Sequence, residues 1–235
     1  MAPNASSSRL PQDGVAYPRG LRVWFWICVV IALGVVARRL KELIAPSALN
    51  PRSPMAGLEA SFSSHAALTA VHIVPAAVFV LCSIVVLSRK GVARWLQWLF
   101  FVSGWVTGLT AYAMSYDAFG GWIERSAVMT FDTWFLYSLT RAFLLFVRGS
   151  DALQQKRWSI RAVGVLLGIA ATRPVMGVFF ATAPLTHLVP REFFGMAFWV
   201  GFALNTAITE VWLRTGFGLT SGAPNSRVGT VDLRR

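Results

Sequence analysis

Six long apolar stretches follow one another along the chain, separated by shorter segments that hold most of the charged residues. A helix of about 20 apolar residues crosses the roughly 30 Å hydrocarbon core of a bilayer. The pattern therefore predicts an all-α fold, a polytopic bundle of six transmembrane helices. The predicted spans are residues 21–37, 66–88, 95–114, 127–147, 162–182 and 193–213.

The composition agrees with this pattern and argues against a soluble enzyme. Of the 235 residues, 55% are hydrophobic and 14% are charged, whereas an average soluble domain has roughly 25% charged residues. Two cysteines are too few for a disulfide framework. Cys28 and Cys82 both fall inside predicted spans, where we expect them to act as small apolar side chains.

The basic residues predict the orientation of the spans. The chain has 22 Lys and Arg against 10 Asp and Glu, which gives a formal net charge of +12. With six spans, both termini share one side: fourteen of the 22 basic residues fall there, six fall on the other side, and two lie within spans. Basic residues concentrate on the cytoplasmic side of membrane proteins, so we predict cytoplasmic termini. The cluster Arg38, Arg39 and Lys41 opposes this orientation, and a first span that does not cross would explain it.

The chain is predicted to form one membrane domain, residues 21–214, between two tails. Residues 1–20 and 215–235 are rich in Ser, Pro, Gly and Arg, and we expect both to be disordered in the cytoplasm. Anionic lipid of the inner leaflet would attract their charge, and dispersed basic residues without a recognition module argue against a nucleic-acid partner. The first span resembles a signal sequence, but Arg38 and Arg39 follow it where a cleavage site would stand, which favours an uncleaved anchor.

Ionisable side chains inside spans are costly and are candidates for function. At about 1.5 Å per helical residue, His72 and Asp132 both lie roughly 8–9 Å below the outer ends of their spans. Arg173 lies near the midplane, and its long stem can reach the level of Asp132. We therefore predict an outer polar pocket of His72, Asp132 and Arg173, with Tyr112 near its mouth.

A second polar group is predicted near the inner ends of the spans. Arg141 and Glu210 lie at similar depth and could pair, and Arg161 is an alternative partner for Glu210. Asn205 is about 140° away from Glu210 around the helix, so it need not face the same neighbour. Ion pairs of this kind often do no more than fix helix packing, and that interpretation stays open for this group and for the outer one.

Prolines and glycines mark places where the helices could bend or pack closely. Pro75 and Pro174 each free a backbone carbonyl near the outer pocket, and such carbonyls are tolerated where they line a cavity; an ordinary kink is the alternative. Gly104 with Gly108 and Gly164 with Gly168 form two GxxxG pairs, each of which could contact a helix of the same chain or of a membrane-protein partner.

No cofactor is firmly indicated. Haem ligation by two histidines needs facing imidazoles at one depth. The chain has only His65, His72 and His187, and a pair of His65 with His187 near the outer surface is the arrangement that could hold haem b. The sequence has no zinc-ligand spacing, P-loop, nucleophile elbow or Gly-rich dinucleotide fingerprint, so no metal is predicted and no enzymatic reaction is indicated.

Residues 63–214 resemble an uncharacterised family of bacterial membrane proteins, the domain of unknown function 2306. The likeness is carried by His72, by the segment Arg157-Trp158-Ser159-Ile160-Arg161, by Arg173, and by Asn205, Glu210 and Arg214. The chain departs from the family pattern at Ala93 and Gln155, where that pattern has histidines. The resemblance implies a multi-span fold in a bacterial cytoplasmic membrane and no particular reaction.

Three functions remain open at this stage. The outer pocket could bind or transport a small polar or amphiphilic ligand, although no inverted repeat relates the two halves of the chain. The histidines could serve a membrane redox protein with haem or quinone. The glycine faces could instead make the chain an accessory or assembly subunit of a membrane complex.

Overall fold

The computed structural model describes residues 18–45, 63–89 and 91–215, and every regular element among them is a helix. The all-α prediction is therefore confirmed for this part of the chain. Most of the two tails that were predicted to be disordered lies outside the described residues. The predicted borders of the tails are corrected, because Arg19 and Gly20 already belong to the first helix and Thr215 is the last residue of the last helix. The helices are α1 (Arg19–Ile44), α3 (Ala66–Ser88), α4 (Arg94–Ser115), α5 (Gly121–Arg148), α6 (Ala152–Leu166), α7 (Gly168–Thr186) and α8 (Pro190–Thr215).

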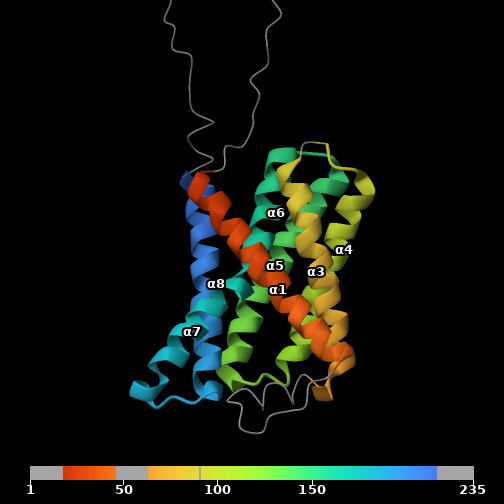
Figure 1. Ribbon diagram of the computed structural model, residues 1–235. Coiled ribbons are helices and arrows are strands. Elements are labelled where there is room, and N and C mark those ends of the chain that lie inside the picture. Colours follow the sequence, from red (N-terminus) through yellow and green to blue (C-terminus); the bar gives the residue numbers. More distant parts are fainter. Residues whose placement is uncertain (1–17, 46–62, 90, 216–235) are drawn as a thin grey trace, which may run out of the picture.

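The helices form one bundle in which the chain runs back and forth between two ends. Figure 1 shows the start of α1 and the end of α8 at the same end of the bundle, which we call the Arg19 end. The opposite end, where α3 begins, is called the Ala66 end. Helix α1 crosses the others obliquely and packs against α3 and α7, whereas α3 with α4, α5 with α6, and α7 with α8 are close neighbours.

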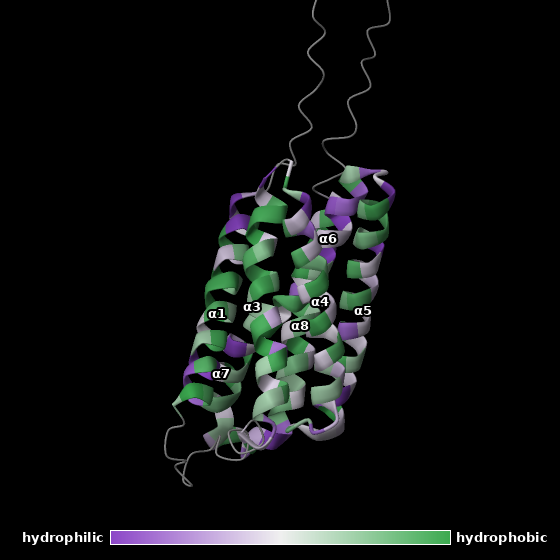
Figure 2. Cartoon of the chain, turned by 90° about the vertical axis from the view of Figure 1, so that its right-hand side faces the viewer, coloured by the Kyte–Doolittle hydropathy of each residue, from purple (hydrophilic) through white to green (hydrophobic). Residues whose placement is uncertain are grey.

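Four helical segments are long and apolar enough to cross a membrane: α1, α3, the stretch Ala152–Thr186 that joins α6 and α7, and α8. Helices α4 and α5 have 22 and 28 residues, so they are long enough, but they are not among the segments whose hydropathy by itself marks a membrane span. In Figure 2 hydrophobic positions cover most of the bundle, and hydrophilic ones gather towards the helix ends with a few inside. A membrane protein is the class that this arrangement suggests.

The predicted fifth span, residues 162–182, differs from the observed structure. The helical segment begins at Ala152, is interrupted at Leu167 and continues to Thr186. At the interruption the Ala170 N–H donates to the Leu167 carbonyl at 2.9 Å, three residues back, which tightens the turn. The prolines do not end their helices, because Pro75 lies inside α3 and Pro174 inside α7.

At both glycine pairs, the space beside each glycine is occupied by side chains from other helices of the same chain. A Cβ at Gly104 would lie 2.7 Å from Leu139 and 2.8 Å from Phe79, and one at Gly168 would lie 2.6 Å from Phe202. Gly108 and Gly164 are closed in the same way, by Leu136 and Thr209 respectively. These glycines let α4 approach α3 and α5, and they let α6 and α7 approach α8. Contact with a membrane-protein partner stays a prediction.

Aromatic rings form the core between these close contacts. Phe79 of α3 and Phe100 of α4 are fully buried and stack with their ring centroids 4.5 Å apart. Phe135 of α5 meets Phe79 edge to face at 5.5 Å. Cys28 and Cys82 are buried in the same core, in the role of small apolar side chains.

Candidate functional site

A cavity of about 270 Å³ lies inside the bundle, and three of the ionisable residues that fall inside predicted spans, His72, Asp132 and Arg173, line it. Its walls come from α1 and from α3 to α8 and are mainly apolar, with Phe131, Phe135 and Phe198 among them. The volume is just below the roughly 300–1,000 Å³ of typical small-molecule sites. The polar side chains on its wall include Arg39, His65, His72, Asp117, Glu124, Asp132 and Arg173.

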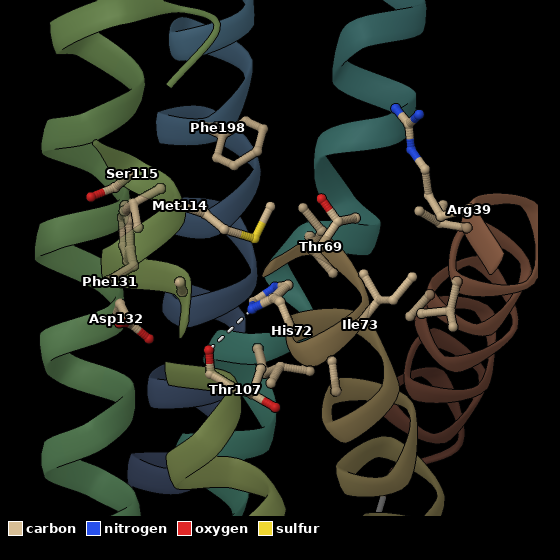
Figure 3. Close-up of a pocket in the computed structure, with 18 of the residues that line it drawn as sticks. Arg39, Thr69, His72, Ile73, Thr107, Met114, Ser115, Phe131, Asp132 and Phe198 are labelled. Carbon is tan, nitrogen blue, oxygen red and sulfur yellow. Dashed lines mark hydrogen bonds between the residues drawn. The ribbon is translucent and has the colours of Figure 1, made fainter. Parts of the chain in front are cut away.

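The structure brings together three of the four residues predicted for the outer pocket. His72 of α3, Asp132 of α5 and Arg173 of α7 all line this cavity. Figure 3 shows the His72 and Asp132 side chains directed into the same space from two helices. Their similar depth follows from residue counting along two antiparallel helices, which is why the sequence could place them together.

Tyr112 is placed differently from the prediction. It is absent from the cavity wall, and its hydroxyl lies 2.6 Å from the Thr133 hydroxyl of α5. The Thr133 hydroxyl donates to the Met129 carbonyl, so the tyrosine hydroxyl is the donor between the two. Tyr112 therefore joins α4 to α5 beside the cavity and does not stand at its mouth.

The ring of His72 is oriented by α4. Its Nδ1 lies 3.0 Å from the Thr110 hydroxyl and 3.2 Å from the Thr107 carbonyl. A carbonyl can only accept, and the Thr110 hydroxyl already has carbonyls of its own helix to donate to. Nδ1 is thus assigned the proton, and Nε2 is the acceptor in the neutral ring.

Asp132 and Arg173 each keep a buried polar atom without a partner. The Asp132 Oδ2 and the Arg173 Nε have no hydrogen bond among the described residues. The only polar contact recorded for Arg173 is weak, 4.0 Å from Nη1 to the Met176 sulfur, and no ion pair joins Asp132 to Arg173 in the described part of the chain. Burying an acceptor and a donor unpaired is unfavourable, and both residues belong to the wall of this cavity.

Further polar groups line the wall towards the Ala66 end. His65 Nε2 lies 3.6 Å from Asp117 Oδ2, and both side chains are about half exposed. Glu124 lies at the start of α5, where its carboxylate accepts a 2.7 Å hydrogen bond from the Gly120 N–H. A Cβ on Gly120 would lie 2.8 Å from the Gly195 nitrogen, so α8 passes directly beside this turn.

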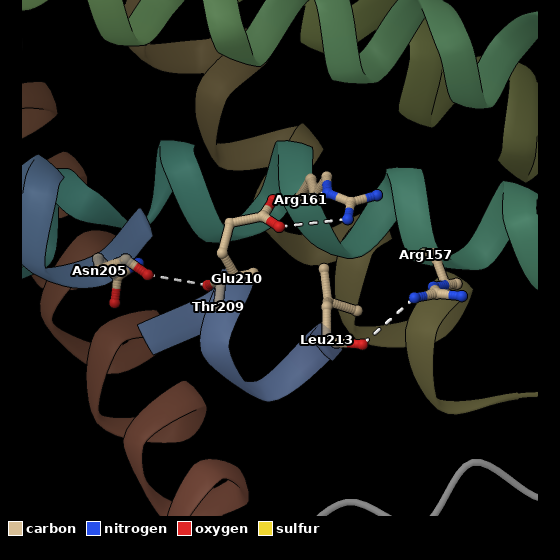
Figure 4. Close-up of polar contacts among 6 residues, drawn as sticks. All are labelled: Arg157, Arg161, Asn205, Thr209, Glu210 and Leu213. Atoms are coloured by element: carbon tan, nitrogen blue, oxygen red, sulfur yellow. Dashed lines mark hydrogen bonds and ion pairs between the residues drawn. The ribbon is translucent and has the colours of Figure 1, made fainter. Parts of the chain in front are cut away.

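Of the two partners that the sequence left open for Glu210, the structure has Arg161. Glu210 pairs with Arg161, whose Nε and Nη2 donate to the two carboxylate oxygens at 2.6 and 3.2 Å (Figure 4). The expected pair of Glu210 with Arg141 is corrected. Here α6 lies against α8, and the Arg141 guanidinium instead lies 5.4 Å from the Trp158 ring centroid.

Asn205 forms a junction that the sequence did not reveal. It is buried, its amide Nδ2 donates to the Gly164 carbonyl of α6, and its Oδ1 accepts from Trp24 Nε1 of α1 at 2.7 Å. Figure 4 also shows Thr209, whose hydroxyl donates to the Asn205 carbonyl at 2.9 Å. Trp24 falls within the first apolar stretch, and nothing in its spacing marked it as a partner of the last one. A second cavity of about 280 Å³ borders this junction.

The two histidines considered for haem are not brought together on the cavity wall. His65 lines the cavity, whereas His187 caps the end of α7 with a left-handed φ of 55° and is absent from the wall. Among residues 18–45, 63–89 and 91–215, no three His, Cys, Asp or Glu side chains are grouped as metal ligands. Haem between His65 and His187 therefore gains no support from this geometry.

Comparisons of the chain with family models, with curated proteins and with solved structures give no match. The likeness to the family of bacterial membrane proteins thus stays a prediction that rests on the motifs alone. Any function has to be argued from the cavity and its side chains.

Proposed function

We propose that the protein is a six-span protein of the bacterial cytoplasmic membrane, with cytoplasmic termini, that binds or moves a small amphiphilic ligand in the cavity of His72, Asp132 and Arg173. In this arrangement α6 and α7 make one crossing, and α4 and α5 cross between the four more apolar segments. The Arg19 end of the bundle is the cytoplasmic end, as the distribution of basic residues favours.

The observation that carries this proposal is that two residues of one cavity wall, Asp132 and Arg173, have an unpaired acceptor and an unpaired donor respectively. Asp132 Oδ2 calls for a hydrogen-bond donor, and Arg173 Nε calls for an acceptor. A head group that does both, such as an amide, a hydroxyl or a carboxylic acid, satisfies the two atoms together. The apolar remainder of the wall suits a short hydrocarbon tail.

Two uncharged probes of similar size separate this chemistry from simple hydrophobic binding. Octanamide can donate to Asp132 and accept from Arg173, whereas methyl octanoate can only accept. Thermal unfolding of the purified protein is measured with each probe. A ligand at ten times its Kd adds about 1.4 kcal/mol to the free energy of unfolding, so we expect octanamide to raise the midpoint and methyl octanoate to have a much smaller effect.

Matched arginine variants locate the binding site. Arg173→Gln should greatly weaken the octanamide effect, because it removes the guanidinium with its Nε–H donor and leaves a shorter amide in its place. Arg191→Gln changes an exposed arginine of α8 that is absent from this wall and should leave the effect intact. Equal effects of both probes on the wild type, or an unchanged octanamide effect in Arg173→Gln, would overturn the proposal.

A further inference from the structure

Away from the cavity, two arginines converge on one tryptophan at the surface between α5 and α6. The Arg161 guanidinium lies 4.5 Å and the Arg141 guanidinium 5.4 Å from the centroid of the Trp158 ring. Tyr137 meets the same ring edge to face, with centroids 5.6 Å apart. Tyr137 and Arg141 are four residues apart on α5 and both are exposed, so they present one face of that helix.

The charges of this cluster do not balance. Arg161 is compensated by Glu210, and the two side chains are only 14% and 21% exposed. Arg141 is exposed, and no carboxylate among the described residues forms an ion pair with it. One full positive charge is therefore left at the surface, next to an aromatic ring.

The position of Arg141 along α5 determines which anion can bind its guanidinium. It lies seven residues before Arg148, the last residue of the helix, which places its backbone about 10 Å from the Arg19 end. If α5 crosses the bilayer, that depth is at the border between hydrocarbon and head groups. There a guanidinium needs a counter-charge or must reach upward for one. The soluble anions of the cytoplasm do not enter this layer, but lipid phosphates lie in it.

We propose that Arg141 and Trp158 form a binding site for the head group of an anionic phospholipid in the leaflet at the Arg19 end. The planar guanidinium can donate two parallel hydrogen bonds to a phosphate, and the rings of Trp158 and Tyr137 offer apolar surface to the upper part of the lipid chains. A zwitterionic head group carries an ammonium that the uncompensated charge of Arg141 repels. The site rests on the proposal that α5 crosses the membrane, and it is independent of ligand binding in the cavity.

The test compares two phospholipids with identical chains. Native mass spectrometry of the full-length protein in a nonionic detergent measures binding of phosphatidylglycerol and of phosphatidylcholine. We expect the wild type to bind phosphatidylglycerol about tenfold more tightly, because both lipids offer a phosphate to the guanidinium but phosphatidylcholine also places an ammonium beside it. Arg141→Gln should bring the ratio of the two affinities close to one, and Arg141→Lys should retain part of the preference.

Arg94 provides the matched control. Its guanidinium also lies over an aromatic ring, 5.9 Å from the Phe146 centroid, but it is the first residue of α4 and stands at the helix end. Arg94→Gln should leave the preference unchanged. A preference that survives in Arg141→Gln, or that falls equally in Arg94→Gln, would overturn the proposal.

Two further measurements keep the outcome decisive. If Arg141→Gln does not fold, brominated phosphatidylglycerol must quench the tryptophan fluorescence of the wild type more than brominated phosphatidylcholine does, and Trp158→Phe must remove that difference. Glycerol 3-phosphate must fail to displace the lipid, because displacement at similar concentrations would show a site for a soluble phosphate. Failure of these lipid tests with an intact octanamide effect would leave the cavity proposal standing.

Discussion

Trp24 donates its indole N–H to the Asn205 side chain at 2.7 Å and thereby connects the first helix of the bundle to the last. The same Asn205 donates to the Gly164 carbonyl, so one amide holds α1, α6 and α8 at a single point. Neighbouring contacts in the bundle are otherwise mainly apolar. We therefore expect this junction to contribute strongly to the free energy with which α1 packs against the rest of the bundle.

Asn205→Leu should lower the free energy of unfolding by about 2 kcal/mol. The substitution leaves the Trp24 N–H and the Gly164 carbonyl without their partner, and each buried unsatisfied group costs about 1–3 kcal/mol in water-soluble proteins, although side-chain hydrogen bonds between membrane helices are often worth less. Denaturation in mixed micelles measures the change. Trp24→Phe, which removes only one of the two hydrogen bonds, serves as the partner in a double-mutant cycle. Strictly additive effects of the two substitutions would contradict the junction.

Gly201→Ala should destabilise the protein by about 1–3 kcal/mol through overpacking. A Cβ at this position would lie 2.6 Å from the Thr172 backbone nitrogen and 2.7 Å from its Cα, so α7 and α8 would have to move apart. Gly177→Ala is the control, because a Cβ there would meet no atom of a neighbouring helix within 4 Å, and alanine favours a helix over glycine by up to about 1 kcal/mol. Thermal midpoints should thus shift in opposite directions, and equal shifts would contradict the close approach of the two helices.

Asp132→Asn should raise the free energy of unfolding by about 1–2 kcal/mol while it weakens octanamide binding. The substitution removes a carboxyl group that has a buried, unpaired oxygen, and sites kept ready for a ligand often cost stability. Asp151→Asn offers a comparison at the N-cap of α6, where its side chain accepts from the Gln154 N–H. Asparagine caps helices as well as aspartate does, so stability should change there by less than about 0.5 kcal/mol. A less stable Asp132→Asn variant would show that the carboxylate is satisfied by contacts within the protein.

The sequence predicted the depth of a residue along its helix, but it did not predict which neighbouring helix supplies the partner of that residue. The depths of His72 and Asp132 follow from counting along two helices, and both side chains reach one cavity. The partner of Glu210 required knowledge of which helix lies beside α8, and the count alone left Arg141 and Arg161 open. The position of Tyr112 was predicted from its depth alone. The side of α4 on which it lies was not predicted, and on that side its hydroxyl contacts Thr133.

Two features of the fold had no clear signal in the pattern of apolar residues. The interruption at Leu167 occurs within an apolar run and seven residues before Pro174, the residue expected to disturb the helix. Gly168 is needed there because Phe202 of α8 fills the space where a side chain would stand. Both are consequences of packing between helices that are distant in sequence, so hydropathy could not reveal them.

The oblique course of α1 has a consequence for access to the cavity. Helices α3 and α7 each pack against α1, and in the described part of the chain they share no extensive contact with each other. Residues of α1 from Ala32 to Arg39 line the cavity directly. In the described part of the chain α1 alone closes this flank of the cavity, so the proposed amphiphilic ligand would have to displace only one helix to enter directly from the bilayer.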